Sequence, residues 1–355
     1  DDCEIGPGED CSISKMTRDR PALVWPGGDT ICMTGMKYKF EVIPRDTDKL
    51  LITFQGGGAC SDSKAVRMGL CCERPIPQQP MGIHGGPMDM FGDHTVVHIL
   101  YCSGDSFLLN ITRDFQYKGY SVENRGLINA LSAISWAKKN MQAQLSSLVI
   151  HGTSAGASAA QGWAKSLLHP DFFGHANAMV LMDSGIGIYP REWIVEDVAH
   201  TNNECVKGYW SAESYAKCVA GDFTMHDMLR DAMQEYPQVA FISIDSKSDP
   251  ILAEFYNMFA QAREAQMLWS DKDYYKLVLN ALRQFAVFPN FGAAVSNLRQ
   301  HGFLTAPGSW QMFTGDGATG VHLFTWLKDI KNATCHAGHW VCQGTAVEEA
   351  LPGIG

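Results

Sequence analysis

The pentapeptide Gly152-Thr153-Ser154-Ala155-Gly156 decides how this chain is interpreted. It follows the apolar run 148–150 and precedes the small-residue run 157–164, an order that predicts a strand, a tight turn and a helix. A serine at the apex of such a turn presents its hydroxyl to a cleft, and glycines flank it because a Cβ would clash where strand and helix lie so close. We therefore expect Ser154 to be a catalytic nucleophile. The competing interpretation is an ordinary glycine-rich turn of a doubly wound sheet.

Composition limits the classes of partner. The 355 residues are 46% hydrophobic, which suffices for one large α/β domain with a full core. The net charge of −10 argues against nucleic acid and against an anionic membrane as partners. No apolar run reaches the roughly 20 residues that a membrane span requires.

Cysteine usage indicates an oxidising compartment. The chain has eleven cysteines and no CxxC pair suited to zinc or redox chemistry. Two pairs are spaced as short loop closures, Cys205 with Cys218 and Cys335 with Cys342. We expect most cysteines to form disulfides, with at least one thiol left free or paired to another chain. Together with sequons at Asn110 and Asn332, this pattern predicts a secreted glycoprotein.

The chain is expected to form one main domain with two appendages. Residues 1–35 predict an extended arm tied by disulfides, 36–330 the α/β domain, and 331–355 a tail closed by a disulfide. Within the domain, 186–236 are interpreted as a helical insertion that caps the cleft, and 61–93 as a long covering loop.

Apolar runs alternate with helical periodicity along the domain. Strands are expected at 37–43, 50–54, 95–100, 145–150, 178–182, 238–244 and, last in the chain, 298–304. Helices are expected at 125–141, 251–267, 274–285 and 321–330. This alternation around one nucleophile turn predicts an α/β fold with a doubly wound, mostly parallel sheet.

A glycine run supplies the expected oxyanion hole. Gly56-Gly57-Gly58 follows the strand at 50–54 directly, and its backbone N–H groups, with that of Ala155, can face a developing negative charge. A mobile loop and a phosphate cradle are the alternatives. A phosphate loop requires Lys and Ser or Thr after the glycines, whereas this run continues as Ala-Cys-Ser-Asp.

The acid that orients the base is expected at the end of a strand after the nucleophile. Asp245 fits, because the strand at 238–244 leads directly into it. Asp183 also ends a strand, and Asp249 follows Asp245 closely. An aspartate in such a place is commonly only a turn residue or a helix cap, so spacing alone leaves the choice open.

Five short motifs occur in a fixed order along the chain. They are Gly56-Gly57-Gly58-Ala59-Cys60, Tyr101-Cys102-Ser103-Gly104-Asp105, Asn124-Arg125-Gly126, Ser154-Ala155-Gly156-Ala157 and Asp183-Ser184-Gly185. In this the chain resembles the pectin acetylesterase family, which includes the secreted Notum-type carboxylesterases, over about residues 35–330. The resemblance implies an α/β-hydrolase fold and removal of acyl groups from esters. It also implies Ser154 as nucleophile, Asp245 as acid, and Gly57, Gly58 and Ala155 as oxyanion hole.

The histidine of the family pattern is missing. In the family it stands after the last strand, and Gln311 occupies about that place here. Glutamine cannot take a proton from serine. Three explanations stay open: another histidine serves, with His339 in the 335–342 loop as first candidate beside His336; the chain is an inactive variant; or the last strand lies elsewhere than at 298–304. His322 begins the last expected helix, and His151 is expected to pack beside the nucleophile strand.

These observations converge on a secreted serine carboxylesterase. Its expected substrate is an O-acyl ester of a glycan, a lipid or a polyester, and neither a cofactor nor a metal is expected. The alternative is an inactive binding protein with the esterase fold. The oligomeric state, the acyl chain length and the alcohol part are left open by the sequence.

Overall fold

The computed structural model describes residues 2–60, 63–77, 90–191 and 210–304, together with Leu323, Leu327 and Lys328. The chain divides into two units. The first comprises residues 1–80 and 91–178, and the second comprises 81–90 and 179–355. The nucleophile turn belongs to the first unit, and the candidate acids Asp183, Asp245 and Asp249 belong to the second.

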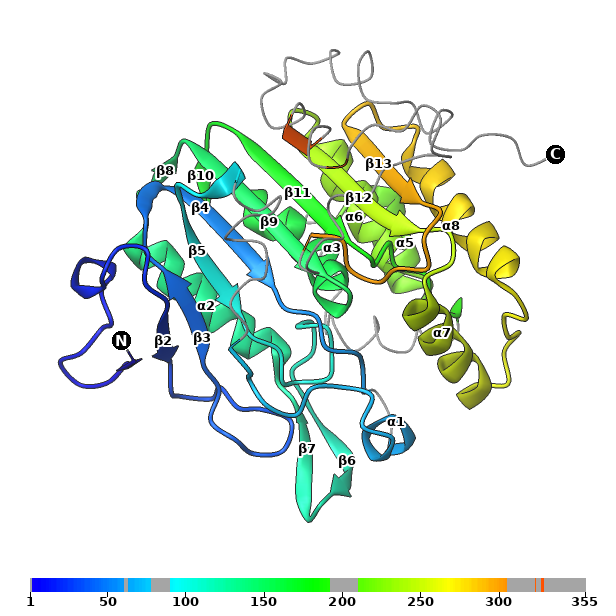
Figure 1. Cartoon of the computed structure of the whole chain (residues 1–355), viewed down its shortest axis with the longest axis horizontal. Coiled ribbons are helices and arrows are strands. Elements are labelled where there is room, and N and C mark those ends of the chain that lie inside the picture. The colour runs from blue at the N-terminus through cyan, green and yellow to red at the C-terminus, as the bar shows by residue number, and fades with distance from the viewer. Residues whose placement is uncertain are drawn as a thin grey trace. The chain divides into compact units, whose positions relative to one another are not determined.

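The first unit is built on a mixed sheet with the strand order β1-β2-β3-β5-β4-β9 (Figure 1). Its strands are β1 (Cys3–Glu4), β2 (Ala22–Trp25), β3 (Phe40–Ile43), β4 (Asp46–Phe54), β5 (His94–Ile99) and β9 (Ser147–Thr153). Strand β4 runs parallel to both β5 and β9, whereas β3 is antiparallel to β2 and β5. The arm expected at residues 1–35 thus supplies two strands, and β3 is buried along its whole length because it lies between β2 and β5.

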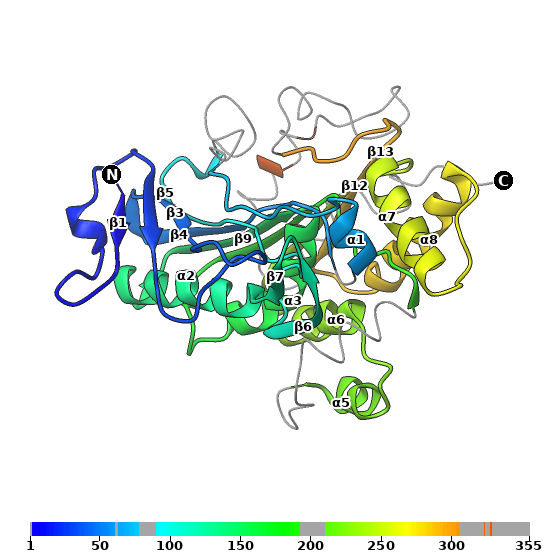
Figure 2. The same ribbon diagram turned by 90° about the horizontal axis from the view of Figure 1, so that it is seen from below.

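Two helices cover one face of this sheet, as Figure 2 shows from below. They are α2 (Gly126–Asn140), which packs against β5, and α3 (Ala155–Leu168), which packs against β9 and β4. Smaller elements complete the unit: η1 (Ile13–Lys15), α1 (Ser63–Arg67), the hairpin β6 (Ile111–Tyr117) and β7 (Tyr120–Asn124), and the pair β8 (Gln144–Leu145) and β10 (Gly174–His175). The helix expected at 125–141 is confirmed.

The second unit holds three parallel strands in the order β11-β12-β13. They are β11 (Ala178–Asp183), β12 (Ala240–Ser246) and β13 (Phe291–Ser296). The described helices are α5 (Ala212–Val219), α6 (Met225–Glu235), α7 (Pro250–Ala262) and α8 (Asp271–Phe285). Helices were therefore correctly expected at 251–267 and 274–285, and within 186–236. The described residues of 321–330, which are Leu323, Leu327 and Lys328, are helical.

The strand expected at 298–304 is wrong. The last strand among the described residues is β13. It pairs in register with β12, from Phe291 opposite Phe241 to Ser296 opposite Ser246. Residues 297–304 form no strand. Their backbone is held by side chains instead, since the N–H groups of Phe303 and Leu304 donate to the carboxylate of Asp183.

Three disulfides cross-link the first unit: two close loops whose cysteines are 8 and 11 positions apart, and one joins cysteines 70 positions apart. Cys3 is bonded to Cys11, Cys32 to Cys102, and Cys60 to Cys71. In the second unit Cys218 is also disulfide-bonded, while Cys205, Cys335 and Cys342 lie outside the described residues. Cys72 is a free thiol, as the odd count led us to expect. None of the described helices is both long and apolar enough to cross a membrane.

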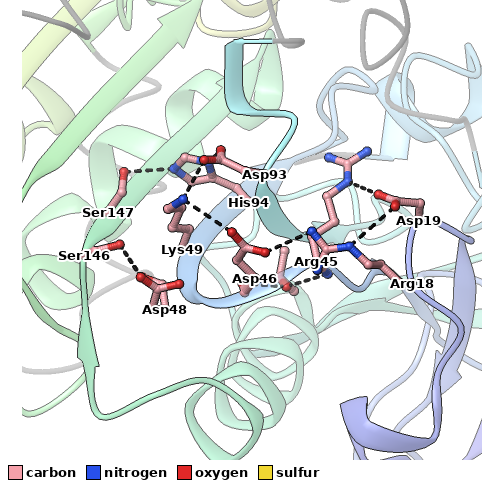
Figure 3. Close-up of polar contacts among 11 residues, drawn as sticks. Arg18, Asp19, Arg45, Asp46, Asp48, Lys49, Asp93, His94, Ser146 and Ser147 are labelled. Carbon is pink, nitrogen blue, oxygen red and sulfur yellow. Dashed lines mark hydrogen bonds and ion pairs between the residues drawn. The ribbon is translucent and has the colours of Figure 1, made fainter.

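A polar network joins the starts of the central strands in the first unit (Figure 3). The ammonium group of Lys49 at the start of β4 donates to Asp93, at 2.7 Å, and to Asp46, at 3.3 Å. His94 at the start of β5 lies 2.7 Å from Asp93 through Nδ1 and 2.9 Å from Ser147 at the start of β9 through Nε2. Burial alone would raise the pKa of Asp93, but the hydrogen bonds with Lys49 and His94 outweigh it and lower that pKa to about 2.

The lowered pKa of Asp93 predicts a loss of stability in acid. The carboxylate is charged in both states above the ordinary pKa of 3.8, so its stabilising contribution is complete there and is lost as the pH falls toward 2. Asp93→Asn should therefore be less stable than the wild type at neutral pH, with a difference in unfolding free energy that shrinks between about pH 4 and pH 2. Chemical denaturation at several pH values measures this difference. Asp29→Asn, at an exposed site, controls for the loss of one negative charge, and parallel wild-type and Asp93→Asn curves down to pH 2 would contradict the expectation.

Candidate active site

The backbone of the nucleophile turn is strained. Ser154 connects β9 to α3 with φ 58° and ψ −123°, a conformation that residues with a side chain seldom adopt. The strand, turn and helix expected from the sequence are all present. A non-glycine residue held in this geometry at a strand–helix junction is the arrangement that lifts a nucleophilic hydroxyl out of a sheet.

The glycines on either side of Ser154 have no room for a side chain. A Cβ at Gly152 would overlap the carbonyl oxygen of Gly156, and a Cβ at Gly156 would overlap the carbonyl oxygen of Phe54 in β4. Both obstacles are backbone atoms, which cannot rotate away as a side chain can. The reason that the sequence suggested for these glycines is thus confirmed.

The glycine run after β4 lies against the nucleophile turn. A Cβ at Gly56 would come within 2.8 Å of the Thr153 carbonyl oxygen and 3.1 Å of the Ser154 Cβ. A Cβ at Gly57 would come within 2.6 Å of the Tyr101 ring. Glycine is therefore required at Gly56 by the backbone of the nucleophile turn and at Gly57 by the side chains of Tyr101 and Cys72.

Backbone N–H groups of the glycine run and of the first residue of α3 are available as hydrogen-bond donors. Among the hydrogen bonds of the described residues, none uses the N–H of Gly57 or Gly58 as donor. Ala155 is the first residue of α3, so its N–H has no acceptor within the helix. Unsatisfied N–H groups beside a serine hydroxyl can stabilise an oxyanion, and the positive end of the α3 dipole adds to this.

The motifs at residues 101–105 and 124–126 are linked to each other by hydrogen bonds. The buried carboxylate of Asp105 accepts from the N–H of Gly126 at the start of α2 and from the Ser103 hydroxyl. The side-chain amide of Asn124 donates to the Ser103 carbonyl oxygen. Burial raises the pKa of Asp105, against the lowering effect of these donors. Motifs that are separate in the sequence therefore form one polar cluster.

His151 is not placed to act as a base. Its side chain is buried, with Nδ1 2.8 Å from the Thr53 hydroxyl and Nε2 3.5 Å from the Thr153 hydroxyl. Burial lowers the pKa of His151 to about 3, so the ring is neutral and both nitrogens are engaged. This agrees with the expectation that His151 packs beside the nucleophile strand.

In the second unit, Asp183 has a structural role. Both of its oxygens accept from the backbone N–H of Phe303, and one also accepts from that of Leu304. The hydroxyl of the next residue, Ser184, accepts from the N–H of Gly302. Burial raises the pKa of Asp183 to about 6, although these donors lower it. The Asp183-Ser184 pair thus fixes the chain that follows β13.

Asp245 lies inside β12, rather than after it as the sequence suggested, and is buried. One carboxyl oxygen accepts from the Ser243 hydroxyl, and the other has no partner among the described residues. Burial and the nearby Asp249 and Asp183 raise the pKa of Asp245 to about 7, against the effect of Ser243. No imidazole in the described part of the chain contacts this carboxyl group.

The imidazole contact is made by Asp249 instead. Asp249 is the N-cap of α7, and its Oδ2 lies 2.7 Å from Nδ1 of His301. Sequence reasoning missed His301 because that residue fell within the strand expected at 298–304. The signal that could have found it is the run Phe291-Gly292-Ala293-Ala294-Val295-Ser296, which suits a tightly packed buried strand. Gln311, His322, His336 and His339 lie outside the described residues.

The described residues contain one group of three side chains with metal-binding atoms close together, namely Cys3, Glu9 and Cys11. The two sulfurs of this group are joined in a disulfide, so they cannot bind a metal ion as thiolates.

The close approach at Gly156 predicts a large effect of one methyl group. In Gly156→Ala the new Cβ meets the backbone of β4, so α3 and β4 must separate, which costs about 1–3 kcal/mol or more by analogy with overpacked cores. We expect a melting temperature lowered by several degrees, or insoluble protein, in thermal unfolding. Gly6→Ala is the matched control, because its Cβ meets nothing within 4 Å. Equal stability of the two variants would contradict the close approach.

Comparisons with known proteins identify the fold. No protein-family model matches the sequence, and no curated relative was found. Among solved structures, the Wnt deacylase Notum from Drosophila is similar over 84% of this chain and 88% of that chain, with a TM-score of 0.58 and 17% sequence identity. The chain therefore has the α/β fold of Notum, as the order of its motifs led us to expect.

Proposed function

We propose that the chain is a secreted serine carboxylesterase that hydrolyses O-acyl esters through an acyl-enzyme. The observation that carries the proposal is the strained Ser154 turn, which the glycine run contacts at Gly56, together with the N–H groups of Gly57, Gly58 and Ala155, which have no acceptor among the described residues. A strained serine backbone and unsatisfied N–H donors both lower the stability of the fold, so they have no use in a purely structural turn. Both are useful when the serine attacks a carbonyl carbon and the donors stabilise the resulting oxyanion.

The reaction proceeds in two halves. The Ser154 Oγ bonds to the ester carbonyl carbon as its proton passes to a general base, and the carbonyl electrons move to the oxygen held by Gly57, Gly58 and Ala155. Collapse of this intermediate breaks the bond to the alcohol, which leaves with the proton. Water then repeats these steps on the acyl-enzyme and releases a carboxylic acid.

The substrate class follows from several weaker observations. The similar solved structure is that of a deacylase, which supports acyl removal as the reaction class. The net charge of −10 is unfavourable for nucleic acid substrates. An acylated glycan, lipid or polyester fits these constraints. Three disulfides among the described residues support secretion.

An inactive binding protein is the second candidate, and Gln311 favours it. A glutamine at the family's histidine position leaves Ser154 without the expected base. Such a protein would keep the turn and the donors yet would neither hydrolyse esters nor react with a fluorophosphonate, which labels only an activated serine.

Activity and labelling separate the two candidates. We expect the wild type to hydrolyse p-nitrophenyl acetate and to be labelled at Ser154 by a fluorophosphonate probe, located by peptide mass spectrometry. Ser154→Ala should lose labelling and on the order of 10⁵–10⁶-fold in kcat, the loss found when a serine hydrolase loses its nucleophile.

Ser132→Ala is the control for this experiment, because its hydroxyl only donates to the Asn129 carbonyl oxygen in α2. It should keep wild-type activity. A wild-type protein that is folded but neither active nor labelled would reject the esterase in favour of the binding protein.

A further inference from the structure

A second serine, histidine and aspartate lie in hydrogen-bond contact within the first unit, at the edge of the sheet where the central strands begin. Oγ of Ser147 lies 2.9 Å from Nε2 of His94, and Nδ1 of His94 lies 2.7 Å from Oδ1 of Asp93 (Figure 3). Ser147 is the first residue of β9, whereas Ser154 follows the last residue of that strand. At about 3.3 Å per residue the two serines are roughly 20 Å apart, so this cluster is separate from the nucleophile turn.

The pairing of the strands brings these side chains together. β4 lies between β5 and β9 and runs parallel to both, so the three strands begin at the same edge of the sheet. Asp46 of β4 is the register partner of His94, and Lys49 of β4 is the register partner of Ser147. The reacting side chains are thus held by strands, which position a group more precisely than loops do.

The protonation states suit transfer of a proton from Ser147. A carboxylate can only accept, so Nδ1 of His94 carries the proton, and Nε2 accepts from the Ser147 hydroxyl. Burial would raise the pKa of Asp93, but the hydrogen bonds with Lys49 and His94 lower it to about 2, so the carboxylate is charged at neutral pH. A base for serine requires this tautomer and this charge on its orienting acid.

Lys49 adds positive charge to the cluster. The hydrogen bond with Asp93 raises the pKa of the Lys49 ammonium, against the effect of burial, so this group stays charged. The charged groups of the described segments that face His94 are Asp93 directly, with Lys49 and Asp46 behind it. The ring of Phe91 packs edge-on against the imidazole, with ring centroids 5.3 Å apart. A cation near the serine favours the negative charge that develops on an attacked carbonyl oxygen.

The base is more deeply buried than the hydroxyl that it accepts from. The His94 side chain is 2% exposed, whereas Ser147 is half-buried. The imidazole is therefore shielded while a small reagent can reach Oγ of the serine. Ser146 is also half-buried, but its hydroxyl donates to the carboxylate of Asp48 at 2.6 Å and contacts no described imidazole. Two adjacent serines of similar exposure thus differ in whether a histidine accepts the hydroxyl proton.

We propose that Ser147 is a second reactive serine, which small neutral esters acylate, with His94 as its base and Asp93 as the residue that positions the base. The proposal does not depend on the esterase, because it uses neither Ser154 nor the donors beside it. Carboxylates at this edge of the sheet disfavour an anionic reagent, and the half-buried hydroxyl favours a small one. These carboxylates belong to Asp46, Asp48 and Asp93.

The proposed step transfers one acyl group to the protein. Oγ of Ser147 bonds to the ester carbonyl carbon as its proton passes to Nε2 of His94. The bond between that carbon and the alcohol oxygen then breaks, and the departing alkoxide takes the proton from the imidazolium. The products are an acylated serine and a free alcohol, and the ester is the only reactant that is needed.

Acetylation by p-nitrophenyl acetate tests the proposal in the Ser154→Ala protein, which lacks the first nucleophile. A long incubation with millimolar ester is used, because acylation without the donors of the Ser154 turn is expected to be slow. Ser146 and Ser147 lie in the same tryptic peptide, 140–165, so fragment ions must distinguish them. We expect the acetyl group to accumulate at Ser147 on the order of 10²-fold faster than at Ser146, the lower end of the range for general-base assistance.

Variants in the same background test the role of each residue. His94→Gln should lower the acetylation rate of Ser147 on the order of 10²-fold, because glutamine cannot take the proton. Ser147→Ala should reduce serine acetylation of the peptide to the slow rate of Ser146. Ser146→Ala is the matched control and should leave acetylation of Ser147 unchanged.

The pH dependence separates a base from a structural residue. The acetylation rate of Ser147 should rise as His94 loses its proton and then reach a plateau. Asp93→Asn should lower the plateau and move the midpoint of the rise to lower pH, since the amide no longer stabilises the imidazolium. A residue that only supported the fold would not move this midpoint.

The contrary outcomes are equally definite. Equal acetylation of Ser146 and Ser147, or none at either, in a folded Ser154→Ala protein overturns the proposal. A rate at Ser147 that rises with hydroxide concentration and reaches no plateau does so as well, even where His94→Gln fails to fold. None of these results bears on the esterase, which is judged from Ser154 in the wild type, and an inactive Ser154 leaves the measurement at Ser147 unaffected.

Discussion

The close approach of the Ser154 turn to the backbone of β4 is the constraint on which the first unit depends. Gly152 and Gly156 admit no Cβ, because the carbonyl oxygens of Gly156 and Phe54 occupy the space that a side chain would need. That contact brings the start of α3 and the glycine run after β4 together. Among the described residues, the N–H groups of Gly57 and Gly58 in this run donate to no acceptor, so they are available to an oxyanion.

The sequence predicted those parts of the site that are determined by residues close together in the chain. A serine between two glycines, after an apolar run and before a helix, has one common structural solution, and β9 and α3 follow it. Strands β4, β5, β11 and β12 were predictable for the same reason, since uninterrupted apolar runs are typical of parallel strands buried on both faces.

The parts that could not be predicted depend on contacts between distant residues. The strand β13 has small residues in place of a run of large apolar ones, so its sequence signal is weak, and its pairing with β12 identifies it. The segment 297–304 has apolar residues but is held by Asp183 and Ser184, which lie more than a hundred positions earlier. Misplacing this one strand concealed His301. The partner of Asp249 was therefore missed.

One carboxylate oxygen of Asp249 caps α7, and the other contacts the imidazole of His301. These two hydrogen-bonding roles have different chemical requirements. Capping a helix needs only an acceptor, which a neutral amide also provides, whereas a hydrogen bond from an imidazole N–H is stronger when its acceptor is charged. A single change from aspartate to asparagine would therefore keep the cap of α7 while weakening the contact with the imidazole.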